Sequence, residues 1–183
     1  MRKKSLEEQL REQESIEQTL GERRHPIVGV LDNLRSAYNV GAIFRTADGI
    51  RAERLILCGF TPTPPRQDIR KTALGAEESV PWQHTGEVTE AVRELREAGY
   101  QIVVLERTDE CHELRQVRFR FPVALVVGNE WHGVTDAVLS QADLAVFIPM
   151  YGRKTSLNVA VAFAVAAYEI LRQWQVDARA GHS

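Results

Sequence analysis

Short apolar runs and longer stretches with helical spacing alternate along most of the 183-residue chain. Five runs have the length and the branched composition of buried parallel strands: residues 27–31, 55–58, 102–105, 123–127 and 145–148. Stretches with helical spacing lie between and after them, at residues 40–48, 88–98, 135–140 and 157–174. This alternation predicts an α/β domain in which a parallel sheet is flanked by helices.

The two ends of the chain have a different pattern. Residues 1–24 are rich in Glu, Gln and Arg, and they place Leu6 near Leu10 and Ile16 near Leu20 on a helix. We therefore predict a polar helical arm over 1–24, a folded domain over 25–175 and a tail over 176–183. The arm's basic residues cluster at its two ends, so it either contacts a polyanion or forms a solvated helix packed weakly on the domain.

The last predicted helix, residues 157–174, is apolar on nearly every side in its first turns and then narrows to Tyr168, Leu171 and Trp174. A helix that is apolar all round is a buried helix. The pattern predicts burial in the core of one subunit, against a second subunit, or both.

Composition excludes several classes of protein. The chain is 44% apolar and 26% charged, as ordinary globular domains are, and it has no apolar run near the roughly 20 residues of a membrane helix. Its start turns acidic instead of apolar, so we expect no signal peptide and a cytoplasmic location. Cys58 and Cys111 form no Cys-x-x-Cys pair and the five histidines are scattered, so we predict neither a disulfide nor a metal site.

The formal net charge of −2 gives no general attraction to nucleic acid, so polyanion binding would need a local patch. One candidate patch lies within residues 51–73, where the basic residues are Arg51, Arg54, Arg66, Arg70 and Lys71. The proline-rich stretch 61–65 predicts that part of this segment is a surface loop. Such a loop either grips phosphates or is simply a solvated charged loop.

Two familiar nucleotide-binding motifs are absent. Gly128 and Gly133 have P-loop spacing, but Val134 and Thr135 follow where a P-loop has Lys and Ser or Thr. No Gly-x-Gly-x-x-Gly follows a predicted strand. We therefore expect a ligand held by backbone at strand ends, where open α/β sheets usually bind ligands.

Three separated segments carry unusual polar residues next to strands or loops: residues 39–45, 125–133 and 148–158. Together and in this order they resemble the three signature motifs of the SpoU (TrmH-type) RNA ribose 2′-O-methyltransferases, a branch of the SPOUT superfamily. The resemblance covers roughly residues 26–172, and residues 71–77 add a softer match. Any one motif alone would be a weak signal, whereas the three together are specific.

The resemblance implies a SPOUT fold with a C-terminal deep trefoil knot, S-adenosylmethionine as cofactor, and a homodimer. The implied cofactor contacts are Leu105, Gly128, Ile148, Met150 and Leu157. A Cβ at Gly128 would obstruct an adenosine that approaches the backbone there. Ile148 and Leu157 could instead be plain core residues. The residues that we expect to bind RNA are Arg66, Arg70 and Lys71.

The implied catalytic and RNA-contacting set is Asn39, Arg45, Glu130, Ser156 and Asn158, and all five are present. An arginine is too basic to accept a proton, so we expect Arg45 to clamp a phosphate and to stabilise a developing alkoxide. We expect Glu130 to orient Arg45, and Ser156 and Asn158 to anchor their loop or the ribose. Asn39 and Ser156 are also candidate helix N-caps.

The implied activity is transfer of a methyl group to a ribose 2′-hydroxyl in RNA. Many rRNA-directed relatives carry an additional N-terminal domain, and only about 25 residues precede the first predicted strand, which favours tRNA over rRNA. The alternative is a non-catalytic RNA-binding or adaptor protein with the same fold, which would bind RNA regardless of cofactor. Asn129, Trp131 and His132 stand where many relatives have smaller residues, so we expect different RNA contacts there.

Overall fold

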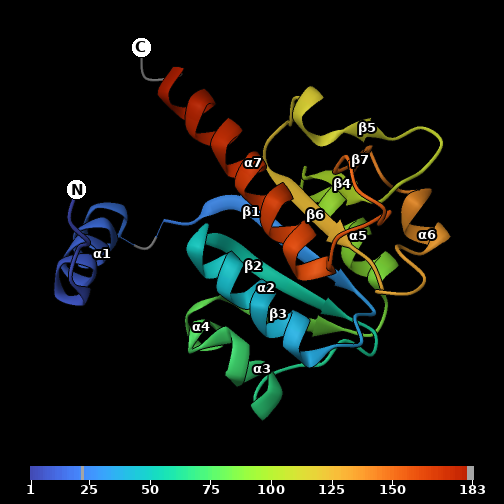
Figure 1. Cartoon of the computed structure of the whole chain (residues 1–183). Coiled ribbons are helices and arrows are strands. Elements are labelled where there is room, and N and C mark those ends of the chain that lie inside the picture. The colour runs from blue at the N-terminus through green and yellow to red at the C-terminus, as the bar shows by residue number, and fades with distance from the viewer. Residues whose placement is uncertain (22, 181–183) are drawn as a thin grey trace.

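A computed structural model describes residues 1–21 and 23–180. Seven parallel strands form one sheet in the order β3-β2-β1-β6-β4-β7-β5 (Figure 1). The strands are β1 (His25–Asp32), β2 (Ala52–Cys58), β3 (Trp82–Thr85), β4 (Gln101–Leu105), β5 (His112–Glu113), β6 (Val123–Val127) and β7 (Leu144–Phe147). The five predicted strands are confirmed, and β3 and β5 are additional edge strands.

Helices cover both faces of the sheet. The described helices are α1 (Leu6–Leu20), α2 (Ala37–Gly49), α3 (Gln67–Ala73), α4 (Ala76–Ser79), α5 (Val88–Glu97), α6 (Asp136–Leu139), α7 (Val159–Ala180) and the short 3₁₀ helix η1 (Leu114–Gln116), and all but α1 and η1 cover the sheet. Figure 1 shows α2, α3, α4 and α7 on one side of the sheet and α5 and α6 on the other. Side chains alternate along each strand, so Val103 packs under α2 and α7 while Ile102 and Val104 pack under α5. The predicted α/β class is confirmed.

Helices α2 and α3 approach closely at Gly41. A Cβ on Gly41 would lie 2.1 Å from the Thr72 hydroxyl and 2.3 Å from the Ile69 carbonyl oxygen. The Thr72 hydroxyl also donates a hydrogen bond to the Tyr38 carbonyl oxygen at 2.9 Å. This contact fixes α3 beside α2. The last part of the charged segment 51–73, from Gln67 to Ala73, is therefore helix α3 and not a surface loop.

Both helices that border the predicted motifs begin with caps that differ from the predicted ones. The Ser36 hydroxyl accepts the Asn39 N–H at 3.3 Å and caps α2. The Asn158 side chain accepts the Ala160 N–H at 3.0 Å at the start of α7. The predictions that Asn39 and Ser156 are the N-caps are therefore wrong.

Helix α7 continues past Trp174, its predicted end, through Ala180. Buried Gln173 holds this part of the helix, because its amide donates to the Val117 carbonyl oxygen at 3.0 Å and accepts the Phe119 N–H at 3.1 Å. Residues 176–180 of the predicted tail are thus helical, and residues 181–183 lie outside the described residues.

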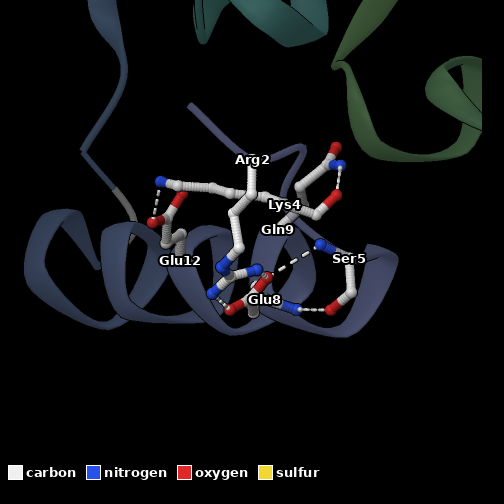
Figure 2. Close-up of polar contacts among 6 residues, drawn as sticks. All are labelled: Arg2, Lys4, Ser5, Glu8, Gln9 and Glu12. Atoms are coloured by element: carbon white, nitrogen blue, oxygen red, sulfur yellow. Dashed lines mark hydrogen bonds and ion pairs between the residues drawn. The ribbon is translucent and has the colours of Figure 1, made fainter.

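Helix α1 is the predicted polar arm, and none of its residues is buried. Figure 1 shows it beside the domain, and Figure 2 shows the polar contacts at its start. Ser5 and Glu8 form a capping box at the start of the helix. The pKa of Glu8 is lowered to about 2, and the main cause is the hydrogen bonding of its carboxylate to Arg2. Local bonds of this kind stabilise a helix that buries little apolar surface.

Two further expectations concern the whole chain. None of the described helices is both long and apolar enough to cross a membrane. The trefoil knot expected in the C-terminal part stays a prediction.

Candidate functional site

A pocket of about 360 Å³ lies at the carboxyl ends of β4, β6 and β7, beside the first turn of α7. Four of the five predicted cofactor contacts line it: Leu105, Gly128, Ile148 and Leu157. Met150, half-buried three residues after β7, lies outside this lining. The pocket therefore sits at the sheet edge where parallel α/β folds bind ligands.

Gly128 lines the pocket, and the structure gives it a second role beside the predicted cofactor contact. A Cβ there would lie 2.1 Å from the Gly133 carbonyl carbon and 2.2 Å from the Val134 nitrogen. The chain folds back at this point, because Asn129 and Gly133 exchange backbone hydrogen bonds of 3.0 and 2.9 Å. The space beside Gly128 is thus filled by the protein's own backbone.

Glu106, at the end of β4, is a pocket residue that the sequence reasoning missed. Its carboxylate accepts the Val134 N–H at 3.0 Å and the Arg107 N–H at 2.9 Å. A Cβ at Gly133, whose φ is +69°, would lie 2.2 Å from this carboxylate. Glu106 therefore holds the fold-back loop against β4. The available signal was an acidic residue directly after a buried strand, at the ligand-binding edge of the sheet.

Three polar residues from the three predicted motifs meet beside the pocket, and two of them, Glu130 and Asn158, line it. The Asn39 side-chain amide donates to Glu130 at 2.8 Å, and the Asn158 side-chain amide donates to the Asn39 side-chain oxygen, Oδ1, at 3.1 Å. Glu130 also accepts the backbone N–H groups of Arg35 at 2.9 Å and Ser36 at 3.2 Å. This Asn158–Asn39–Glu130 chain links the start of α7, the start of α2 and the loop after β6.

The surroundings of Glu130 keep its carboxylate ionised. Partial burial acts to raise its pKa, but hydrogen bonds from the Arg35 backbone and the Asn39 side chain outweigh it, and the pKa lies below the ordinary value. A carboxylate with a lowered pKa is a poor proton acceptor near neutral pH. Glu130 is therefore suited to orienting Asn39.

Arg45 lies apart from this cluster. It is exposed on α2 and lines a separate hollow of about 480 Å³ with Lys71, Thr72 and Tyr168. Six helical residues put its backbone about 9 Å along the helix from Asn39. The groups that donate hydrogen bonds to Glu130 belong to Arg35, Ser36 and Asn39 and not to Arg45, so the expected Glu130–Arg45 contact is wrong. Ser156 is exposed on the pocket rim.

The predicted RNA-binding residues lie at the start of α3 and within it. Arg66 is exposed at the helix start, Arg70 lies 3.4 Å from Glu77 and 3.2 Å from Glu78, and Lys71 lies 3.1 Å from Asp68. These carboxylates partly neutralise Arg70 and Lys71. Lys71 nevertheless shares the hollow with Arg45, so two cations border it.

A metal centre has no support from the side chains. Within residues 1–21 and 23–180, no three or more His, Cys, Asp or Glu side chains are grouped so that they could hold a metal ion.

Solved structures of known proteins have the same fold. The TrmH/SpoU tRNA modifying enzyme of A. aeolicus superposes with a TM-score of 0.80 at 28% identity, covering 92% of this chain and 85% of that chain. The SpoU methyltransferase AviRb of Streptomyces viridochromogenes, in complex with the cofactor AdoMet, gives a TM-score of 0.72 at 31% identity, covering 82% and 59%.

Curated relatives lead to the same family. The tRNA (guanosine(18)-2′-O)-methyltransferase of Thermus thermophilus is 32% identical over 158 residues, which are 86% of this chain and 80% of that protein. The 23S rRNA (guanosine-2′-O-)-methyltransferase RlmB of Haemophilus influenzae is 33% identical over 159 residues, 86% of this chain and 64% of that protein. A TrmH family tRNA/rRNA methyltransferase of Staphylococcus haemolyticus is covered over 58% of its length, so the chain spans about three fifths of some of these relatives.

The family model described as "SpoU rRNA Methylase family" matches residues 26–168. This match takes in β1 to α7, including the pocket, the fold-back loop and the Asn158–Asn39–Glu130 chain. The protein belongs to the SpoU rRNA methylase family.

Proposed function

We propose that this protein transfers a methyl group from S-adenosylmethionine to a ribose 2′-hydroxyl in RNA. The observation that carries the proposal is the Asn158–Asn39–Glu130 chain at the rim of a ligand-sized pocket. The Thermus and Haemophilus relatives are both named as RNA 2′-O-methyltransferases, which supports the same reaction.

The pocket fits the cofactor chemically. Its volume of about 360 Å³ is within the range of small-molecule sites, and it combines apolar side chains with the polar Glu106. We propose that Leu105, Ile148 and Leu157 contact the adenosine part, with Gly128 and Met150 beside it. Bound S-adenosylmethionine supplies an electrophilic methyl group.

The protein's own residues then position the RNA. In the proposed site, Asn39 and Asn158 hold the target ribose, Glu130 fixes the Asn39 amide, and Ser156 borders the same opening. Orienting two reactants in this way accounts for a large share of many enzymatic rate accelerations. Arg45 and Lys71, at the separate hollow beside α3, hold a phosphate of the same strand, and Arg45 also stabilises the developing alkoxide.

Replacing Arg45 by alanine should weaken RNA binding about tenfold and reduce the salt dependence of binding by about one phosphate contact. The affinity for S-adenosylmethionine should stay unchanged, because Arg45 lies outside the pocket lining. Filter binding of RNA across a salt series measures the first effect. Arg93→Ala, an exposed arginine of α5 on the other face of the sheet, is the control. If Arg45→Ala methylates saturating RNA at a single-turnover rate within a few fold of wild type, Arg45 does not stabilise the alkoxide.

The proposed RNA is tRNA, with rRNA as the alternative. The fold's likeness to the tRNA modifying enzyme of A. aeolicus, with a TM-score of 0.80, supports this preference.

Methyl transfer tests the function directly. Radiolabelled S-adenosylmethionine is incubated with tRNA and, separately, with rRNA from cells that lack this protein, and the RNA is digested to nucleosides. A labelled 2′-O-methyl nucleoside from tRNA is the expected result. RNA binding that is equal with and without cofactor, and no label, would support the adaptor alternative.

We also propose a homodimer through α7. Val161, Val165 and Tyr168 are exposed and form one stripe at helical spacing on this helix. Light scattering should give twice the mass of one chain, and Val165→Lys, which places a charge in the stripe, should shift the protein toward monomer. A wild-type monomer at micromolar concentration would contradict the dimer.

A further inference from the structure

Trp131 is an exposed tryptophan at the mouth of the pocket. Its side chain is 78% exposed, yet it lines the pocket together with Glu130 and Arg107. The other tryptophans are better covered, since Trp82 is 36% exposed and Trp174 packs against a phenylalanine ring. A large aromatic surface left in water beside a ligand pocket is typical of a binding site.

The backbone that carries Trp131 is held in place. The Asn129 side-chain oxygen accepts the Trp131 N–H at 2.9 Å and the His132 N–H at 3.2 Å. Asn129 itself is buried, and its amide donates to the Asn33 carbonyl oxygen at 2.7 Å. The exposed indole thus belongs to a hydrogen-bonded turn, and a preformed surface loses little entropy when it binds.

Arg35 covers one face of the indole. Its guanidinium carbon lies 5.5 Å from the ring centroid, within cation–π range. The Arg35 backbone N–H donates to Glu130, so the carboxylate that orients Asn39 also holds Arg35 beside Trp131. An arginine stacked on an aromatic face keeps N–H groups free to bind phosphate.

We propose that Trp131 stacks on the base of the nucleotide whose ribose is methylated, with Arg35 on the opposite face of the indole. This inference rests on the proposed function. A base is bonded directly to its ribose, so a ribose held at Asn39 places its base beside the residue that follows Glu130. Every base has a π face, so this contact accepts any base that is unpaired, either in a loop or extruded from a helix.

RNA binding by a Trp131 variant tests the proposal without requiring turnover. Fluorescence anisotropy is measured with a labelled unpaired RNA oligonucleotide and with a duplex of the same sequence, at one salt concentration and with S-adenosylmethionine present. Trp131→Ala should bind the unpaired RNA about tenfold more weakly, within the range of one lost stacked base, and should bind the duplex as wild type does. Trp131→Phe, which keeps a stacking ring, should retain most of the affinity.

Trp82→Phe is the control for Trp131→Phe, because Trp82 begins the edge strand β3, which β2 and β1 separate from the strands that end at the pocket. The proposal fails if Trp131→Ala binds unpaired RNA as wild type does, if it loses equal affinity for both RNAs, or if wild type does not bind unpaired RNA. It also fails if Trp131→Ala changes the mass in light scattering, since the indole would then belong to a subunit interface. Failure of the proposed function would be seen separately, because wild-type protein would then transfer no methyl group to RNA.

Discussion

Replacing Glu130 by glutamine should lower the methyl-transfer rate about 100-fold and leave the affinity for S-adenosylmethionine within a few fold of wild type. The carboxylate accepts N–H groups from Arg35, Ser36 and Asn39 with its two oxygens. A glutamine amide has only one oxygen, so its NH₂ group must face one of these donors. Either the Arg35 N–H or the Ser36 and Asn39 donors then face an NH₂ group, so the loop that carries Glu130 must shift relative to α2 and Asn39. A misplacement of about 1 Å can cost about 100-fold in rate.

Single-turnover methylation at saturating RNA and cofactor measures this effect. Glu94→Gln, which removes an exposed carboxylate from α5 on the other face of the sheet, is the control and should behave as wild type. Asn39→Asp should resemble Glu130→Gln, because it places a second carboxylate against Glu130. A Glu130→Gln rate within a few fold of wild type would show that this chain of hydrogen bonds is not needed for methyl transfer.

The pH dependence of stability gives a second measurement on Glu130. Burial acts to raise the pKa of this carboxyl group, but the hydrogen bonds it accepts outweigh burial, so its folded pKa lies below the ordinary value of 4.5. A group with a lowered folded pKa stabilises the protein fully above its unfolded pKa and loses this contribution as the pH falls through the folded pKa. Wild type and Glu130→Gln should therefore differ most in unfolding free energy above about pH 5, and the difference should shrink in more acidic solution.

The sequence predicted the centre of the sheet because its strands are buried on both faces. Residues 123–127 have one apolar side chain after another, and all five are buried in β6. The edge strand β3 has the sequence Trp-Gln-His-Thr, with three exposed side chains, and β5 is two residues long. Neither has an apolar run, because an edge strand with one exposed face does not need one.

The motifs predicted which residues come together more reliably than which atoms touch. Asn39, Glu130 and Asn158 do form one cluster. The predicted contact between Glu130 and Arg45 was wrong because the helical rise of α2 places Arg45 about 9 Å along the helix from Asn39. Arg45 lies there beside α3 and Tyr168. The hydrogen bond that Glu106 accepts from the Val134 N–H joins residues 28 apart in the chain. No local sequence pattern predicts such a contact.

Replacing Gly128 by alanine should weaken S-adenosylmethionine binding at least about 100-fold. The added Cβ would lie 2.1 to 2.3 Å from three backbone atoms of Gly133 and Val134. Backbone cannot rotate away as a side chain can, so the fold-back loop must shift, at a cost of about 1–3 kcal/mol or more. The fold-back loop carries Glu130 and Gly133, and Gly133 lies against Glu106. A shift of the loop therefore deforms the pocket both at the loop itself and at Glu106.

Calorimetric titration with S-adenosylmethionine and thermal unfolding of the cofactor-free protein together distinguish two explanations for this glycine. If Gly128 only leaves room for the ligand, alanine lowers the affinity and leaves the stability of the free protein unchanged. If the fold-back requires it, as the distances to Gly133 indicate, both decrease. Gly86→Ala is the control, since no described atom lies within 4 Å of its added Cβ. Unchanged stability of Gly128→Ala would show that the fold-back loop tolerates a Cβ, which leaves the ligand contact predicted from the sequence as the role of this glycine.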